Sequence, residues 1–262
     1  MRSFSKFIVT TAVVLMGSAS VSAYAQTDME YVKQKGTMTV GITEFAPMDY
    51  KNEKGQWIGF DADVAKAFAK SLGVKCQFQL IDWDNKVLEL KSKNIDVVWN
   101  GMTLTDEVKS SMETSRAYCN NAQTVVMPKD KIKKYPTVAS MKSLTVAAES
   151  GSAGQKEAKA VGLKVLEVTD QATAVLEVKS GNADAAVIDS LMAAAMVGPG
   201  TSYDKLSYSL KLNSEEYGVG FRKGSDMAAA LNKFLVKAYK DGSLKKIAKQ
   251  YKVQAALIDL SK

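Results

Sequence analysis

Residues 94–109 read Asn-Ile-Asp-Val-Val-Trp-Asn-Gly-Met-Thr-Leu-Thr-Asp-Glu-Val-Lys, and the rest of the chain is organised around them. Residues 95–99 are apolar apart from Asp96 and largely β-branched, which is typical of a buried parallel strand. The apolar run stops at Asn100, and Gly101 lets another group approach the backbone closely. Ligands bind at the carboxyl ends of strands in open α/β sheets, so this turn is a candidate binding edge. An ordinary strand-to-helix turn is the alternative.

Strand and helix patterns alternate twice along the chain, which predicts two α/β units with mainly parallel sheets. In the first unit, Asp61 is expected to cap a helix whose apolar positions Val64, Phe68 and Leu72 recur every four residues. We expect strands over residues 38–42, 74–81 and 95–99 in the first unit and over 144–148, 164–168 and 184–188 in the second. Segments 123–127 and 217–221 are expected to cross between the units, and two helices end the chain.

Four segments together resemble the family 3 periplasmic solute-binding proteins, the amino-acid receptors of ABC importers. They are Trp99-Asn-Gly-Met-Thr-Leu-Thr-Asp-Glu, Gly59-Phe-Asp-Ala-Asp-Val-Ala, Gly181-Asn-Ala-Asp-Ala-Ala and Tyr217-Gly-Val-Gly-Phe-Arg-Lys-Gly. The resemblance covers the whole mature chain, and it is specific as a set. It implies an α/β fold of the type II periplasmic-binding-protein class. Each of the two lobes is then an open, mainly parallel sheet with flanking helices, and two crossing strands join the lobes.

The domain prediction follows from this order of segments. We expect a signal peptide over residues 1–25, the first part of lobe 1 over 26–127, lobe 2 over 128–214 and a return to lobe 1 over 215–262. Arg2 and Lys6 precede an apolar stretch, and Ala23-Tyr-Ala offers the small residues that a signal peptidase reads. The stretch is too short for a transmembrane anchor, and no cysteine near the cleavage point would carry a lipid. A periplasmic protein without a lipid anchor is expected.

Composition excludes several function classes. The net charge falls from +7 to +5 without Arg2 and Lys6, and no basic block is interleaved with aromatic residues, so nucleic-acid binding is not expected. The chain has no histidine, which excludes His-based triads and most zinc sites. Cys76 and Cys119 are too few for a metal cluster. Two buried thiols are favoured for them, and a disulfide is left open. Neither a metal nor a cofactor is expected.

Residues 150–154, Ser-Gly-Ser-Ala-Gly, connect an expected strand to the next helix, where free N–H groups attract an anion. In the family this loop holds the α-carboxylate of the ligand, and the resemblance assigns that contact to Ser152 and Ala153. A plain glycine-rich turn is the alternative.

Asp189 follows the expected strand over residues 184–188. The family places there the carboxylate that pairs with the α-ammonium of the ligand, and Asp189 can also cap the next helix. The resemblance adds Gly101, through its carbonyl group, and Thr103, through its hydroxyl. Phe45 is similar to the aromatic residue that covers the ligand in relatives, and Trp83 to a second wall. Ordinary core packing is the alternative for both rings.

Val108 departs from the family pattern. Relatives carry arginine five residues after the position of Thr103, where its planar fork binds the α-carboxylate. Lys109 is one residue further on and would lie on another helix face. Either the loop over residues 150–154 holds the carboxylate without the arginine, or the ligand has no α-carboxylate. Glu149, where some relatives have a basic side chain, would act with Glu44 and Asp189 to favour a ligand with more than one positive group.

The leading hypothesis is a non-enzymatic, monomeric receptor that delivers an amino acid or related small amine to an ABC permease at the inner membrane. Binding is expected to close the lobes about the crossings near Met127 and Tyr217. One alternative is an enzyme, because some members of this fold are dehydratases, with Glu44 and Glu149 as the acid or base candidates. The other alternative is a ligand-sensing module for a membrane receptor.

Overall fold

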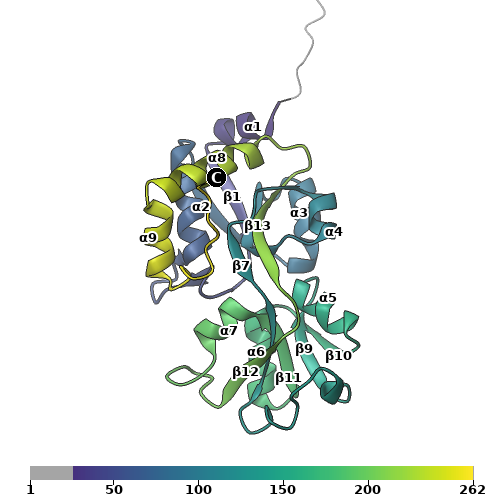
Figure 1. Cartoon of the computed structure of the whole chain (residues 1–262). Coiled ribbons are helices and arrows are strands. Elements are labelled where there is room, and N and C mark those ends of the chain that lie inside the picture. The colour runs from purple at the N-terminus through teal and green to yellow at the C-terminus, as the bar shows by residue number, and fades with distance from the viewer. Residues whose placement is uncertain (1–25, 262) are drawn as a thin grey trace, which may run out of the picture.

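Two sheets flanked by helices form the two lobes of the computed structural model, which describes residues 26–261 (Figure 1). The lobe 1 sheet has the order β4-β1-β5-β13-β6, with β7 paired to β13. Its strands are β1 (Thr37–Ile42), β4 (Lys75–Leu80), β5 (Val97–Thr103), β6 (Glu113–Thr114), β7 (Cys119–Asn121) and β13 (Glu215–Phe221). Strand β1 is parallel to β4 and β5, whereas β13 is antiparallel to β5.

The lobe 2 sheet repeats this plan in the order β10-β9-β11-β8-β12. Its strands are β8 (Gln123–Pro128), β9 (Thr145–Glu149), β10 (Lys164–Val168), β11 (Ala185–Asp189) and β12 (Leu206–Lys211). Strands β9, β10 and β11 are parallel, and β8 is antiparallel to β11 and β12. In both lobes, therefore, three parallel strands end at the same edge, and these two edges meet between the lobes.

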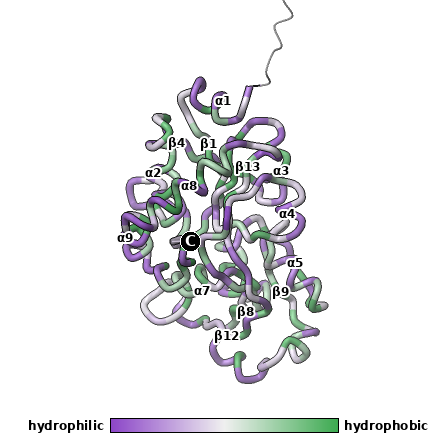
Figure 2. Tube along the Cα trace, turned by 45° about the horizontal axis from the view of Figure 1, so that its top comes forward, coloured by the Kyte–Doolittle hydropathy of each residue, from purple (hydrophilic) through white to green (hydrophobic). Residues whose placement is uncertain are grey.

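Helices cover both sheets. Lobe 1 carries α1 (Asp28–Lys35), α2 (Phe60–Ser71), α3 (Lys86–Lys91), α4 (Asp106–Ser111), α8 (Met227–Lys240) and α9 (Ser243–Gln250), and a short hairpin of β2 (Tyr50–Lys51) and β3 (Trp57–Ile58). Lobe 2 carries α5 (Ala153–Ala160), α6 (Gln171–Ser180) and α7 (Ser190–Met196). Hydrophobic residues lie mainly inward and hydrophilic residues along the outer helices and turns (Figure 2). No helix within residues 26–261 is long and apolar enough to span a membrane, and the predicted signal peptide lies outside the described residues.

The crossing points differ from the prediction. Strand β8 pairs with β11 and β12, so residues 123–127 already belong to the lobe 2 sheet, and the chain crosses at Ala122, between β7 and β8. Lobe 2 therefore begins at Gln123 rather than at residue 128. The return crossing lies between Lys211 and Glu215, the end of β12 and the start of β13. A buried apolar run looks the same in a sheet strand and in a crossing strand, which is why the sequence misplaced the hinge.

Asp61 does not cap α2. The helix begins after Gly59, and the Asp61 carboxylate accepts hydrogen bonds from the N–H of Gly101 (2.7 Å) and from the hydroxyl of Tyr118 (2.7 and 2.8 Å). Gly101 has φ +55°, and a Cβ there would lie 2.2 Å from the Phe45 ring. The hydrogen bond to Asp61 and the packing of the Phe45 ring thus fix the backbone of Gly101 on β5. Gly101 is part of the candidate binding edge.

The two cysteines are free thiols. Cys76 is half-buried on β4, and Cys119 is buried on β7. Burial raises the pKa of the Cys76 thiol to about 12 and that of Cys119 well above its ordinary value. The favoured prediction was of two buried thiols: the structure has Cys119 buried and Cys76 half-buried, and both are protonated at neutral pH.

Candidate ligand-binding site

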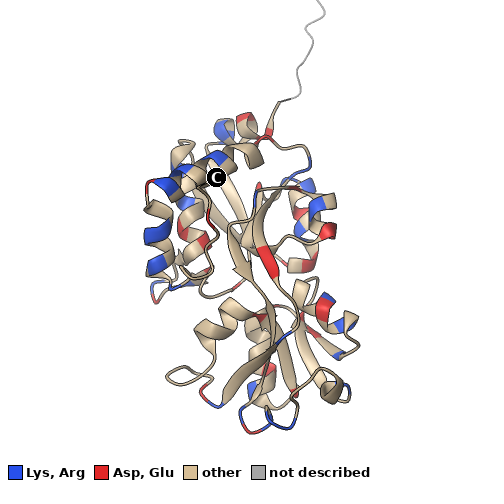
Figure 3. Ribbon diagram, viewed as in Figure 1, with Lys and Arg blue, Asp and Glu red and all other residues tan. Residues whose placement is uncertain are grey.

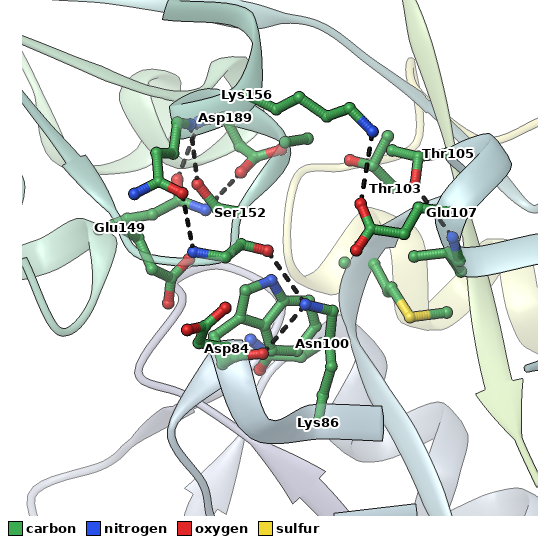
Figure 4. Close-up of a pocket in the computed structure, with 18 of the residues that line it drawn as sticks. Asp84, Lys86, Asn100, Thr103, Thr105, Glu107, Glu149, Ser152, Lys156 and Asp189 are labelled. Atoms are coloured by element: carbon green, nitrogen blue, oxygen red, sulfur yellow. Dashed lines mark hydrogen bonds and ion pairs between the residues drawn. The ribbon is translucent and has the colours of Figure 1, made fainter. Parts of the chain in front are cut away.

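A cavity of about 390 Å³ lies between the lobes at the carboxyl ends of β5, β9 and β11 (Figure 4). This volume is within the range of small-molecule sites. The predicted residues that line it are Trp83, Asn100, Gly101, Thr103 and Val108 from lobe 1 and Glu149, Ser152, Ala153 and Asp189 from lobe 2. The two halves of the predicted set therefore meet in one space, although they are far apart in the sequence.

Two predicted residues lie elsewhere. Phe45 is buried in the core, where its ring packs against Gly101 and lies edge-on to Tyr217 at 6.3 Å between centroids. Glu44 is half-buried in the same turn, and neither residue lines the cavity. The backbone hydrogen bonds between Phe45 and Asp49 fold this turn back on itself. This turn packs Phe45 against Gly101 and away from the cavity. Of the two predicted aromatic residues, only Trp83 lines the cavity.

The Asp189 carboxylate accepts hydrogen bonds from four described side chains. Its Oδ1 accepts hydrogen bonds from Asn121, Gln123 (3.1 Å) and Tyr217 (2.6 Å), and its Oδ2 accepts one from Gln171. Each carboxylate oxygen has two acceptor positions, so Oδ2 keeps one for a ligand. Burial and then the neighbouring Glu215 raise the pKa of Asp189 to about 7. Asp189 is the N-cap residue of α7 by position, but its side chain makes no capping hydrogen bond, and its contact with a ligand stays a prediction.

Glu215 is a hinge residue that sequence reasoning missed. Its Oε1 accepts hydrogen bonds from Thr103 (2.9 Å), Asn121 (2.7 Å) and Gln123 (2.8 Å). Figure 3 shows this acidic stretch of β13 where the crossing strands pass between the lobes. Asn121 and Gln123 also donate to Asp189, so one polar network joins both crossings to the cavity. The only signal in the sequence is Glu215-Glu216 before an apolar strand, which resembles an ordinary solvated strand end.

Some polar groups of the loop over residues 150–154 already form hydrogen bonds with the start of α5. Ser152 is the N-cap of α5, and its hydroxyl oxygen accepts the N–H of Gln155 at 3.0 Å. The Gly151 N–H donates to the Gln155 side chain at 3.1 Å. The first N–H groups of a helix have no acceptor within it, so Ala153 and Gly154 supply the donors that remain for an anion.

Glu149 lies at the end of β9 with an exposed fraction of 2%. Its Oε1 has no hydrogen-bond donor among the described residues. Burial and then the charge of Asp189 raise its pKa to about 8. A hydrogen bond from Gln171 and the charge of Lys86 lower this pKa by less than burial and Asp189 raise it. A further cationic group beside Glu149 would therefore favour its ionised form.

The other lining residues show how the site is held. The Asn100 side chain joins the ends of β5 and β1 through the N–H (3.1 Å) and the hydroxyl (2.7 Å) of Thr43. Val108 is an apolar part of the wall, and Thr105 caps α4 through the Val108 N–H at 3.2 Å. Within residues 26–261 no group of three or more Cys, Asp or Glu side chains is placed to hold a metal ion.

Two lobes, two crossing segments and a cavity with charged groups from both lobes are the features of a two-lobed solute-binding protein. Residues 38–254 match the bacterial extracellular solute-binding proteins, family 3, and the chain belongs to this family. The fold is the predicted type II periplasmic-binding-protein fold.

Three similar proteins are named for an amino acid that they bind or were solved with one. The L-cystine-binding protein TcyJ of Escherichia coli (strain K12) is 28% identical over 246 residues, which cover 92% of each chain. The arginine-binding extracellular protein ArtP of Bacillus subtilis is 31% identical over 216 residues, 79% of this chain and 82% of that protein. The ABC uptake transporter substrate-binding protein of Streptococcus pneumoniae, solved with bound histidine, has a TM-score of 0.80 at 26% identity and covers 87% of this chain and 97% of that chain.

Proposed function

We propose that the protein captures an amino acid or a related small amine in the periplasm and delivers it to an ABC permease, acting as a monomer released from its signal peptide. The observation that carries this proposal is the cavity shared by both lobes, with Trp83 and Val108 on one side and Asp189 and Ser152 on the other. A ligand bound by both faces stabilises the closed arrangement through contacts that an open arrangement lacks.

The polar groups of the cavity favour a ligand that carries at least one ammonium group. Asp189 and Glu149 are both buried and both line the cavity. Relatives that are named for arginine, histidine and cystine binding support an amino acid over other small amines. The enzyme alternative is weaker, because Glu44 lies outside the cavity and leaves Glu149 as its one predicted acid–base group.

A ligand screen tests the proposal. We expect at least one amino acid or amine to raise the melting temperature of the mature protein, because a ligand that binds only the folded state stabilises it in proportion to the logarithm of its concentration over Kd. Small-angle scattering should then show a smaller radius of gyration when that ligand is saturating. An unchanged radius with a tight ligand would contradict lobe closure, and chemical conversion of the ligand would favour the dehydratase-like alternative.

Glu149→Gln is expected to reduce the preference for ligands with two positive groups about tenfold or more, because it removes one buried ionic partner. Binding of such a ligand to the wild type should also strengthen as the pH rises from 6 to 8. The raised pKa of Glu149, about 8, means that the protonated form prevails below this value and must lose its proton to pair with a cation.

Calorimetry with lysine and with its neutral isostere norleucine, at three pH values, measures both effects. The matched control is Glu167→Gln, an exposed glutamate on β10. Equal selectivity and equal pH dependence in wild type and Glu149→Gln would exclude Glu149 as a cation partner.

A further inference from the structure

We propose that Lys86 binds the carboxylate of the ligand and thereby decides between amino acids and their decarboxylated amines. The inference rests on the proposed function and goes beyond it by assigning the anionic half of the ligand to one side chain. Lys86 was not among the sequence-predicted site residues, because a lysine at the start of an amphipathic helix is usually a solvated one.

Lys86 is buried inside the cavity rather than solvated. It is the first residue of α3, after the turn Trp83–Asn85, and its exposed fraction is 9%. Its Nζ donates to the carbonyl oxygen of Trp83 and, across the cleft, to that of Gly151, both at 3.0 Å. The same Nζ lies 4.9 Å from the centre of the Trp83 ring. Figure 4 shows the side chain extending from lobe 1 toward the lobe 2 loop.

The Lys86 ammonium group has one donor left. An ammonium carries three N–H groups, and the two carbonyl oxygens account for two of them. No described carboxylate lies within the 4.0 Å of an ion pair with Lys86, although Glu149, Asp84 and Glu107 are the acidic groups that act on it most strongly. Burial is the main cause that lowers its pKa. A buried cation with only dipolar partners is a favourable place for a ligand carboxylate.

The other lysines of the cavity have different surroundings. The Lys156 side chain is 57% exposed and lies 3.4 Å from Glu107, and the Lys159 side chain is 52% exposed and lies 2.7 Å from Glu167. Both are solvated and already face a carboxylate. Among the described residues that line the cavity, Lys86 is therefore the one buried cation.

The position of Lys86 also matches the anion-binding end of α5. Its Nζ contacts the carbonyl oxygen of Gly151, two residues before Ala153, whose N–H opens the helix. A carboxylate placed there would contact the Lys86 ammonium from lobe 1 and the first N–H groups of α5 from lobe 2. Asp189 lines the same cavity and would face the ammonium group of the ligand. Lys86 and Asp189 would thus bind the two charged groups of an amino-acid zwitterion without an arginine at position 108.

Paired ligands separate this role from a purely structural one. Calorimetry at pH 8 measures the affinity for each amino acid that binds and for the amine formed by its decarboxylation. The proteins compared are wild type, Lys86→Met, Lys86→Arg and the control Lys91→Met. Lys91 is an exposed lysine at the other end of α3. We expect Lys86→Met to weaken amino-acid binding about tenfold or more, the loss of one charge-assisted bond, and to leave amine binding within about threefold. Lys86→Arg should keep most of the amino-acid affinity because it keeps the charge.

Three outcomes overturn the inference. Equal losses for amino acid and amine in Lys86→Met would show that Lys86 only holds the lobes together through Gly151. Unchanged amino-acid binding would show that the α5 N–H groups suffice. A wild type that prefers the amine would show that no carboxylate is bound. Binding of neither compound in any pair would instead refute the proposed function itself, and with it this inference. Melting curves of both Lys86 variants confirm that each is folded.

Discussion

Replacing Asp189 by asparagine is expected to weaken ligand binding at least tenfold and up to several thousandfold. Loss of one partner of a buried ion pair at a binding site costs about 2–5 kcal/mol. Asp189 is 4% exposed, and its Oδ2 accepts a hydrogen bond only from Gln171 among the described residues. Asparagine keeps the shape of the side chain, and the change removes the charge together with one of the two acceptor oxygens.

Calorimetry at pH 8 measures the loss, because the pKa of Asp189 is raised to about 7 and the wild-type carboxyl is then largely ionised. Asp184→Asn is the matched control. Asp184 directly precedes the same strand, β11, at its far end, and accepts the N–H of Thr145 at 3.0 Å outside the cavity. The control should bind normally even if its stability falls. Equal affinities of Asp189→Asn and wild type would exclude Asp189 as the ammonium partner.

The sequence predicted those parts of the site that follow directly from strand ends. Asp189 and Glu149 occupy the last positions of two parallel strands, and Gly101 and Thr103 lie on a third. Parallel strands end at one edge of a sheet, which accounts for Asp189 and Glu149 in lobe 2. The family resemblance was needed to place Gly101 and Thr103 of lobe 1 in the same site. The element pattern was predictable because buried strands and amphipathic helices have distinct periods.

The residues that the sequence missed depend on side-chain direction. Lys86 and Glu215 carry charges that are usually solvated, and only the packing of the two lobes turns them inward. Phe45 shows the opposite error, since an aromatic residue after a strand end faces the core as readily as the cavity. The family pattern gave no help at Val108, which stands where relatives have arginine, whereas the structure places Lys86 in the wall of the same cavity.

Asp49→Asn is expected to raise the free energy of unfolding at pH 8. Asp49 is fully buried beside Asp61, and neither of its carboxyl oxygens has a hydrogen-bond donor among the described residues. Burial and then the charge of Asp61 raise the pKa of Asp49 well above 3.8, while Lys66 opposes this and Asp63 and Glu44 add to it. Asparagine loses no hydrogen bond of the wild type and carries no ionisable group, so the part of the cost that grows with pH disappears.

The sign of the pH dependence makes this prediction specific. A raised pKa in the native state means that the native protein binds more protons than the unfolded chain above about pH 4, so the free energy of unfolding falls as the pH rises. The pKa values of Asp189, about 7, and Glu149, about 8, are also raised, so the wild-type slope is shared among several carboxyls. The slope that Asp49→Asn removes is therefore the informative quantity.

Urea unfolding at pH 5 and pH 8 should show the stability difference between Asp49→Asn and wild type growing with pH. Asp130→Asn, an exposed aspartate in the turn after β8, should show no such growth. A variant that is less stable than wild type at pH 8 would mean that Asp49 has a partner of opposite charge in solution. Asp61 links Asp49 to the binding edge: its pKa is raised to about 7, mainly by burial, its carboxylate accepts the N–H of Gly101, and its charge raises the pKa of Asp49. Removing the repulsion between Asp49 and Asp61 should therefore stabilise the end of β5, where the ligand is proposed to bind.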